Sequence, residues 1–377
     1  MKKSAQNRII IWSIVSAALI FILVAGFVFY AYGRFVPSLN DRLYRNNYGT
    51  DYDITYEIIN ETASRLEYST DDVFDINIYL SNGKVIFKES NSDNIEVTQL
   101  ESSSSDEADH LNTFYYQYDY ATLNIYGSEA DYNLDGQDFS ASNLTLAFEN
   151  LFTDTPDKTI VVKIPKNTYM HDINIYTASA DIDVNNIESN YTSINSVSGY
   201  INANSVNSAY LSIQNVSGNI NFSRITADEL TINKVSGDVS AEGDIQLIDF
   251  ESVSGDLNYT TDSLNTNSIS VNTVSGNANI TLPQNSGFTV INSSISGELQ
   301  SGFSGKTVGE HYIYGDGNTA IELNSVSGSI SIQPNKSNQT EQAKSNKKQN
   351  DDKETTAPTS TTSPTATTAP DGKEAKD

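Results

Sequence analysis

The middle of the chain reads SVSGYINANSVNSAYLSIQNVSGNINFSRITADELTINKVSGDVS from Ser196 to Ser240. The tripeptide Val-Ser-Gly occurs three times in this stretch, with its glycines 19 residues apart. Followed in both directions, the pattern has seven copies, one of which begins with isoleucine, and they end in Gly199, Gly218, Gly237, Gly255, Gly276, Gly297 and Gly328. A repeat with a period near 20 residues predicts a stack of similar coils, with these glycines at the corners.

Apolar and polar residues alternate on both sides of each tripeptide, which is the pattern of half-buried strands. The position five residues before the glycine is held by Ile194, Ile213, Ile232, Phe250, Val271 and Leu323, with Asn292 as the one exception. Each coil is therefore predicted to run as strand, tight corner and strand, with the valine of the tripeptide pointing inward. Glycine suits such a corner because it adopts backbone conformations that a Cβ opposes. Two imperfect copies precede the repeat, at 178–180 and within 74–87, where Asn82-Gly83 replaces Ser-Gly.

These patterns predict an all-β fold, a right-handed parallel β-helix or β-solenoid with coils of about 19–21 residues. A β-rich N-terminal cap would cover the first end of the stack, because an open sheet edge recruits other strands. The expected division is a cytoplasmic N-terminus at 1–8, a transmembrane helix at 9–32, a juxtamembrane linker at 33–55, a capping region at 56–165, the solenoid at 166–334 and a disordered Thr/Pro-rich tail at 335–377.

Residues 9–32 contain no charged side chain and are numerous enough to cross a bilayer as a helix. Lys2, Lys3 and Arg8 precede this run, which favours a cytoplasmic N-terminus and an extracellular remainder. A cleaved signal peptide is the alternative, but its apolar core is normally shorter. We therefore predict a single-pass protein of the cell membrane.

The net charge of the chain is −26, and residues 46–334 hold nine Lys/Arg against forty Asp/Glu. So acidic a surface repels nucleic acid, which excludes nucleic-acid binding, and favours cations or basic partners. The chain has no cysteine, so disulfides and thiolate metal sites are excluded as well.

Acidic or amide residues follow several of the corners, among them Asp181, Asp238 and Asp256. Stacked in adjacent coils, their oxygens are candidate ligands for Ca²⁺. A solvated acidic face is the alternative, and we expect no cofactor. Catalytic residues are not expected either: residues 166–334 contain four basic side chains and two histidines, too few for the groove of a polysaccharide lyase or hydrolase.

The recurring Val-Ser-Gly-Asp-Val pattern resembles the bacterial β-strand-repeat proteins of domain-of-unknown-function family 4097, a family of candidate adhesins. Two proline-marked strands that lead into coils, at 160–181 and 279–297, add to the resemblance, which covers about residues 55–334. It implies a β-helix-like fold and a place in the cell envelope, and it brings no active site.

We therefore predict a membrane-anchored, extracellular β-solenoid that acts as a non-catalytic binding or structural module of the cell surface. The alternatives are a cell-envelope stress sensor or regulatory accessory protein, and a polysaccharide-active β-helix enzyme. The expected partners are the membrane and either a cell-wall polymer, a host or surface ligand, or another membrane protein. The tail is compatible with a disordered segment, a wall-embedded spacer or a glycosylated stalk.

Overall fold

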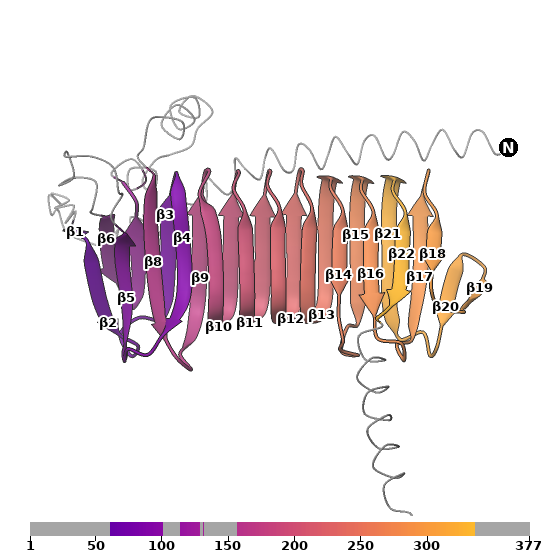
Figure 1. Cartoon of the computed structure of the whole chain (residues 1–377), viewed down its shortest axis with the longest axis horizontal. Coiled ribbons are helices and arrows are strands. Elements are labelled where there is room, and N and C mark those ends of the chain that lie inside the picture. The colour runs from indigo at the N-terminus through magenta and orange to yellow at the C-terminus, as the bar shows by residue number, and fades with distance from the viewer. Residues whose placement is uncertain (1–60, 101–113, 129–130, 132–156, 336–377) are drawn as a thin grey trace, which may run out of the picture. The chain divides into compact units, whose positions relative to one another are not determined.

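The computed structural model describes residues 61–100, 114–128, 131 and 157–335, and its strands form one sheet (Figure 1). The 22 strands are β1 (Glu61–Ala63), β2 (Arg65–Ser69), β3 (Asp75–Leu80), β4 (Gly83–Ser90), β5 (Asn94–Leu100), β6 (Phe114–Asp119), β7 (Thr122–Tyr126), β8 (Lys158–Pro165), β9 (Tyr169–Thr177), β10 (Asp181–Ser196), β11 (Ile201–Asn215), β12 (Ile220–Lys234), β13 (Val239–Ser254), β14 (Leu257–Thr260), β15 (Ser268–Ser275), β16 (Ala278–Leu282), β17 (Phe288–Ser294), β18 (Leu299–Ser301), β19 (Lys306–Val308), β20 (His311–Tyr314), β21 (Thr319–Ser327) and β22 (Ile330–Pro334).

The expected transmembrane helix at 9–32 and the tail after residue 335 lie outside the described residues. Within the described ranges, the structure has no helix of the length and apolar character that a membrane crossing needs.

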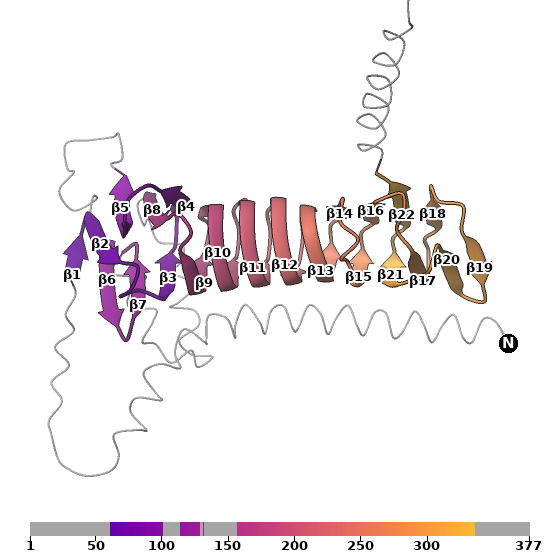
Figure 2. The ribbon, with the colours of Figure 1, turned by 90° about the horizontal axis from the view of Figure 1, so that it is seen from below.

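The stack is built from parallel pairing of each coil with the next, as the repeat predicts. β10, β11, β12 and β13 pair in parallel over almost their whole lengths, and each strand bends to serve two faces of the stack (Figure 2). The first half of β10 pairs with β4, whereas its second half pairs with β9. Each coil thus contributes one segment to either face, and the core lies between them.

The predicted inward columns are confirmed. Ile213, Ile232 and Phe250 are in register in consecutive coils, and each side chain is fully buried. The opposite face contributes Ile201, Ile220 and Val239 to the same core, also in register and buried. Aliphatic side chains from the two faces therefore meet along the whole repeat.

The expectation that the valine of each tripeptide points inward is wrong. Val216 and Val235 are only half-buried, whereas the residues before them, Asn215 and Lys234, are buried. The strand alternation continues up to the corner, so the residue three before the glycine faces the core. This position is polar in successive coils and forms a buried polar column of Thr177, Ser196, Asn215, Lys234, Ser252, Thr273 and Ser325.

Glycine at the corner is required by backbone conformation in some coils and by space in others. Gly199, Gly218, Gly237 and Gly255 have positive φ values, as expected for a left-handed corner. Gly276 does not, but a Cβ there would lie 2.1 Å from the carbonyl oxygen of Gly255 in the neighbouring coil. The corners are stacked so closely that any side chain would separate the coils.

A second corner, which the sequence analysis did not identify, accounts for the shortest repeat. Asn186, Ser205 and Arg224 have φ values of 53–55° at equivalent places in β10, β11 and β12. In β13 this residue is missing, because the register shifts and Ile225 pairs with Gly243. The coil that ends at Gly255 therefore spans 18 residues, where its predecessors span 19.

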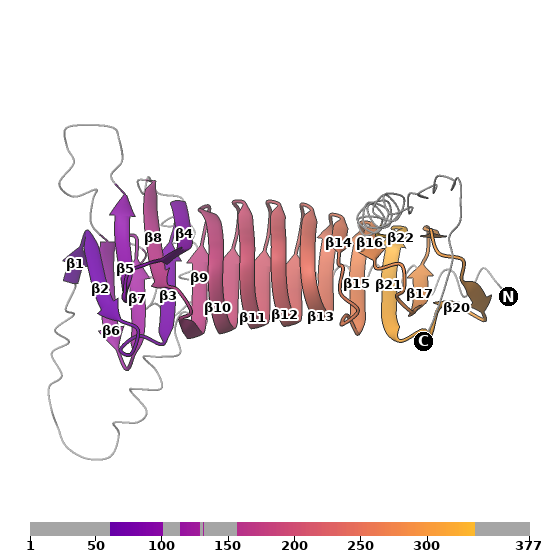
Figure 3. The same ribbon diagram turned by 60° about the horizontal axis from the view of Figure 1, so that its bottom comes forward.

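The order of the coils departs from chain order at both ends of the stack. β21 lies between β15 and β17, so the coil of Gly328 is inserted before the coil of Gly297 (yellow between orange in Figures 1 and 3). At the other end β3 lies between β7 and β9, and β4 between β8 and β10. Parallel pairing thus reaches into the residues assigned to the capping region, and the imperfect coil at Asn82-Gly83 belongs to the stack.

Antiparallel strands follow the last parallel coil at both ends. β5 pairs with β8 and β6 pairs with β7 at one end, and β20 pairs with β17 at the other. The hairpin of β19 and β20 makes up much of the 31-residue spacing between Gly297 and Gly328. A change from parallel to antiparallel pairing interrupts the repeat and limits the addition of further coils.

Candidate functional site

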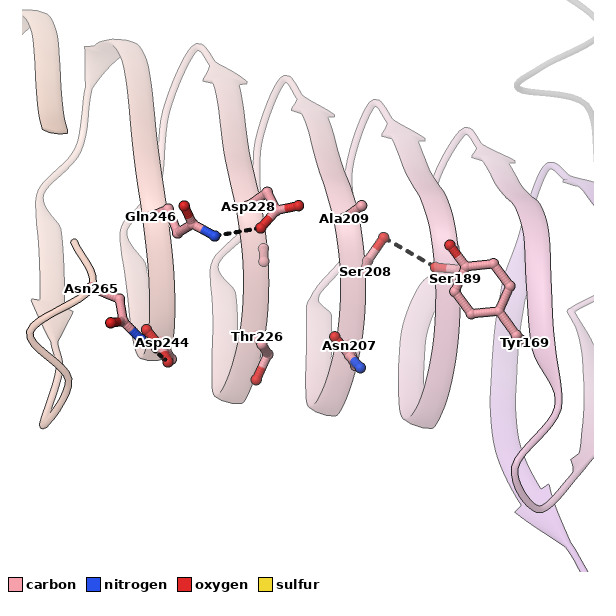
Figure 4. A pocket seen from close by; sticks show the side chains of 11 residues that line it. Tyr169, Ser189, Asn207, Ser208, Ala209, Thr226, Asp228, Asp244, Gln246 and Asn265 are labelled. Atoms are coloured by element: carbon pink, nitrogen blue, oxygen red, sulfur yellow. Dashed lines mark hydrogen bonds between the residues drawn. The ribbon is translucent and has the colours of Figure 1, made fainter. Parts of the chain in front are cut away.

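A groove of about 200 Å³ runs across the coils, from β9 to the segment that precedes β15 (Figure 4). The residues that line it are Tyr169, Ser189, Asn207, Ser208, Ala209, Thr226, Ala227, Asp228, Asp244, Gln246 and Asn265. They come from six successive coils, so the groove extends over five coil steps, roughly 24 Å at the usual strand spacing. It is long enough for an extended ligand to lie across the strands.

The floor of the groove is made of small buried side chains. Ser189, Ser208 and Ala227 are in register in β10, β11 and β12, and all three are buried. Ser189 and Ser208 are joined by a hydrogen bond of 3.0 Å between their Oγ atoms. Larger side chains at this position would fill the groove, so its depth follows from the choice of small residues.

Hydroxyl, amide and carboxylate side chains border this floor. On one side Asn207, Thr226 and Asp244 are in register in three coils. On the other side Gln246 Nε2 donates to Asp228 Oδ1 at 2.5 Å, and the other carboxylate oxygen of Asp228 points toward Ala209 (Figure 4). Among the described residues this second oxygen has no hydrogen-bond partner, so it is free to accept from a ligand.

The two ends of the groove are different. Tyr169, at the start of β9, is 58% exposed and presents its ring at one end. At the other end Asn265 Nδ2 donates to Asp244 Oδ2 at 2.9 Å. Thr266 fixes this segment, because its hydroxyl donates to the carbonyl oxygen of Ile245 at 2.9 Å and contacts the buried Tyr259 hydroxyl at 3.1 Å. The groove wall is therefore held in place by hydrogen bonds to the core.

The charge of the groove is negative. None of its described lining residues is a lysine, arginine or histidine, whereas Asp228 and Asp244 both line it. The groove thus offers hydrogen-bond acceptors and negative charge to whatever enters it, in a chain whose net charge is −26.

The aspartates predicted as Ca²⁺ ligands accept hydrogen bonds from adjacent coils in the structure. The carboxylate of Asp238 accepts a hydrogen bond of 3.0 Å from the backbone N–H of Asp256, and Asp256 in turn accepts one of 2.7 Å from Asn277. Asp181 accepts in the same way from Tyr200, at 2.9 Å. The acidic column is therefore a ladder of side chain to backbone bonds between adjacent coils. The Ca²⁺ prediction itself stays untested.

One group of potential metal ligands exists among the described residues, and it contains none of those three aspartates. It consists of Asp75, His171 and Asp172, whose ligand atoms lie within 4.8 Å of one another. His171 Nδ1 is 3.3 Å from Asp75 Oδ1 and 3.2 Å from Asp172 Oδ1. Burial raises the pKa of Asp172, and the neighbouring Asp75 carboxylate adds to the rise while His171 opposes it. Carboxylate and imidazole together suit a divalent transition metal, but the three groups also satisfy one another as an ion pair.

Lys234 places an amine inside the stack, in the buried polar column. Its side chain is 1% exposed, and Nζ donates to the carbonyl oxygen of Gly218 at 2.8 Å. Burial lowers the pKa of Lys234 to about 8, although the carboxylate of Asp238 partly opposes this effect. The neighbours of Lys234 in the column, Asn215 and Ser252, have side-chain polar atoms without a hydrogen-bond partner among the described residues.

Sequence reasoning did not find the groove or the polar column, although both leave a signal. Ser189, Ser208 and Ala227 lie nine residues after successive corners, at a position where larger residues would close the groove. The column lies three residues before the glycine, where every coil of the regular repeat has a polar side chain. When the coils are aligned on their glycines, the small residues and the polar residues fall at constant positions and indicate both features.

A comparison with curated proteins finds no match. Five chains of solved structures match this one, and they include three bacterial proteins. One is a candidate cell adhesion protein from Clostridium sporogenes, with 10% sequence identity and a TM-score of 0.26. Another is a candidate lipid-binding protein from Parabacteroides distasonis, with 16% sequence identity and a TM-score of 0.39. The third is a candidate adhesin from Bacteroides fragilis, with 10% sequence identity and a TM-score of 0.37. Each similarity covers 73% of this chain and 100%, 96% and 97% of the respective neighbour.

A family model gives the clearest relationship, because it matches residues 73–332, more than two thirds of the chain. The match begins at the first coils of the stack and ends in β22, so it spans the parallel repeat that the structure shows. The chain belongs to the Toastrack DUF4097 family.

Proposed function

We propose that this protein is a non-catalytic binding module of the cell surface, held in the membrane by residues 9–32, with the β-solenoid outside the cell. The observation that carries the binding role is the groove, which brings polar side chains from six successive coils to one continuous hollow. The uncharged run at 9–32 and the basic residues before it support the anchor and its orientation.

The groove supports binding better than catalysis. Its two carboxylates already accept hydrogen bonds from Gln246 and Asn265. No basic side chain lines the described groove to act as the proton acceptor that a lyase needs. A groove of this length, with polar groups at each coil step, suits recognition of an extended chain.

The orientation is tested with single cysteines, because the natural chain has none. Ser240→Cys, at an exposed position of β13, should react with a membrane-impermeant maleimide on intact cells. Ser4→Cys, before the apolar run, should react only after lysis. The opposite labelling pattern would contradict the proposed topology, and labelling of neither residue before lysis would contradict a surface location.

The binding role is tested with the full chain in lipid nanodiscs on a panel of immobilised ligands: peptidoglycan, chitin, chitosan, hyaluronan, collagen and fibronectin. Ala209→Trp places a large ring in the groove and should abolish binding to whichever ligand is retained. Ser240→Trp, an exposed change outside the groove, is the matched control and should bind normally. If nothing on the panel is retained, or if Ala209→Trp binds like the natural chain, the proposed binding role is wrong.

A further inference from the structure

We infer that the groove recognises a glycan chain without acidic groups, built from neutral or amino sugars, with Tyr169 and Asp228 as its main contacts. This inference rests on the proposed function, since it names the ligand class of the same groove. It follows from the groove's shape, charge and one exposed ring.

The negative charge of the groove determines which charge its ligand can carry. Asp228 is exposed and Asp244 is half-buried, and no cation among the described lining residues balances them. An anionic polymer would bring its charges next to these carboxylates, and placing like charges together in an interface is strongly unfavourable. A ligand rich in hydroxyl or ammonium groups instead offers donors to the free oxygen of Asp228.

The side-chain chemistry favours a glycan over a peptide. Among the described lining residues the polar groups are hydroxyls, amides and carboxylates, which can bond to several hydroxyls at once, as in Asn207, Thr226 and Gln246. The floor offers no deep apolar pocket for a peptide side chain, because Ser189 and Ser208 are hydroxylated and bonded to each other. The groove also crosses the strands, so a peptide in it would find no free strand edge to pair with.

Tyr169 supplies the apolar part of the contact. Its ring is exposed at one end of the groove, next to the floor residue Ser189 (Figure 4). The face of a sugar ring carries C–H groups that pack on an aromatic ring, while its hydroxyls remain at the rim. Asp228 belongs to β12, three coil steps from β9, or roughly 14 Å along the groove. One ligand chain lying in the groove therefore reaches both contacts.

Calorimetric titration of the full chain in nanodiscs tests the inference with three sets of soluble oligosaccharides of equal length. These are a chitosan oligomer, which carries ammonium groups, a chitin oligomer, which is neutral, and a hyaluronan oligomer, which is anionic. We expect binding of the first two and none of the third. Tyr169→Ala should weaken binding about tenfold, the effect of losing one aromatic contact. Asp228→Asn should remove any preference for the chitosan oligomer over the chitin oligomer.

Two matched variants control for unspecific effects. Tyr200 is 56% exposed, almost the same as Tyr169, but it lies at a corner outside the groove, so Tyr200→Ala should bind normally. Asp238→Asn removes a negative charge outside the groove and should also leave the preference unchanged.

The outcomes separate the inference from the proposed function. If hyaluronan bound as tightly as the other two oligomers, the groove would still bind glycans, but the inference that its ligand lacks acidic groups would be wrong. A second result would overturn the inference but keep the binding role. In that case the natural chain binds collagen or fibronectin, Ala209→Trp does not bind it, and no oligosaccharide is bound. Equal weakening by Tyr169→Ala and Tyr200→Ala would show that Tyr169 makes no specific contact and would overturn its assignment.

Discussion

Replacing Lys234 with methionine should stabilise the protein at neutral pH, and the gain should disappear in alkali. Lys234 is buried, and its pKa is lowered from 10.5 to about 8. A lowered pKa means that the unfolded chain binds the proton more tightly than the folded one, so the charge costs stability below pH 8. At 1.36 kcal/mol for each pKa unit, the cost is about 3 kcal/mol. It declines as the pH rises from 8 toward 10.5, and above that range the lysine is neutral in both states.

Methionine removes this cost but also removes the donor to the Gly218 carbonyl oxygen, a loss of about 1 kcal/mol at any pH. Lys234→Met should therefore be about 2 kcal/mol more stable than the natural chain at pH 7 and about 1 kcal/mol less stable at pH 11. Urea unfolding at both pH values measures this, and the difference between the two proteins cancels the titration of the 22 tyrosines that they share. Lys306→Met, at an exposed position, controls for the loss of one positive charge. A difference in stability that is the same at pH 7 and pH 11 would refute a buried Lys234 amine.

Three further results are expected. Ile232→Ala, which truncates a fully buried side chain at mid-stack, should lower the free energy of unfolding by about 2–5 kcal/mol in urea titrations. Asp238→Ala should cost about 1 kcal/mol, because the N–H of Asp256 loses its acceptor, whereas Asp238→Asn should cost much less because its amide oxygen can accept the same bond, as that of Asn219 does. Addition of Ca²⁺ should leave the melting temperature unchanged in the natural chain; a rise that Asp238→Asn abolishes would instead make the acidic ladder a metal site.

The fold could be predicted from the sequence because the same local pattern recurs in every coil and predicts the same structure each time. Each coil alone has a short alternating pattern, but the positions of Ile213, Ile232 and Phe250 agree across coils, and this agreement identifies the core. The corner glycines were predicted for the same reason. A repeat does not determine the order of its coils. The local sequence of a coil is the same whether it stacks on the coil before it in the chain or between two earlier coils, as the coil of Gly328 does.

The error on the corner valines has a physical cause. Valine is apolar, and lysine or asparagine three residues before a glycine is normally read as exposed. The structure follows the strand alternation instead, which places Asn215 and Lys234 inside and leaves Val216 and Val235 half-buried. Backbone geometry therefore overrides side-chain polarity at the corner, and the buried polar groups are the consequence.

The groove is harder to predict than the fold, because its floor follows the repeat but its two ends depend on differences between coils. Perfect repetition would continue the same surface over the whole stack. The groove instead ends at Tyr169, where β9 begins, and at Asn265, where the spacing grows from 18 to 21 residues. One carboxylate oxygen of Asp228 is left without a partner because the preceding coil has Ala209 at the facing position. Asp244 Oδ1, which is buried, also lacks a partner among the described residues. In a stack of similar coils, a groove along the repeat ends where neighbouring coils differ, so the irregular spacings of the sequence are places to search for function.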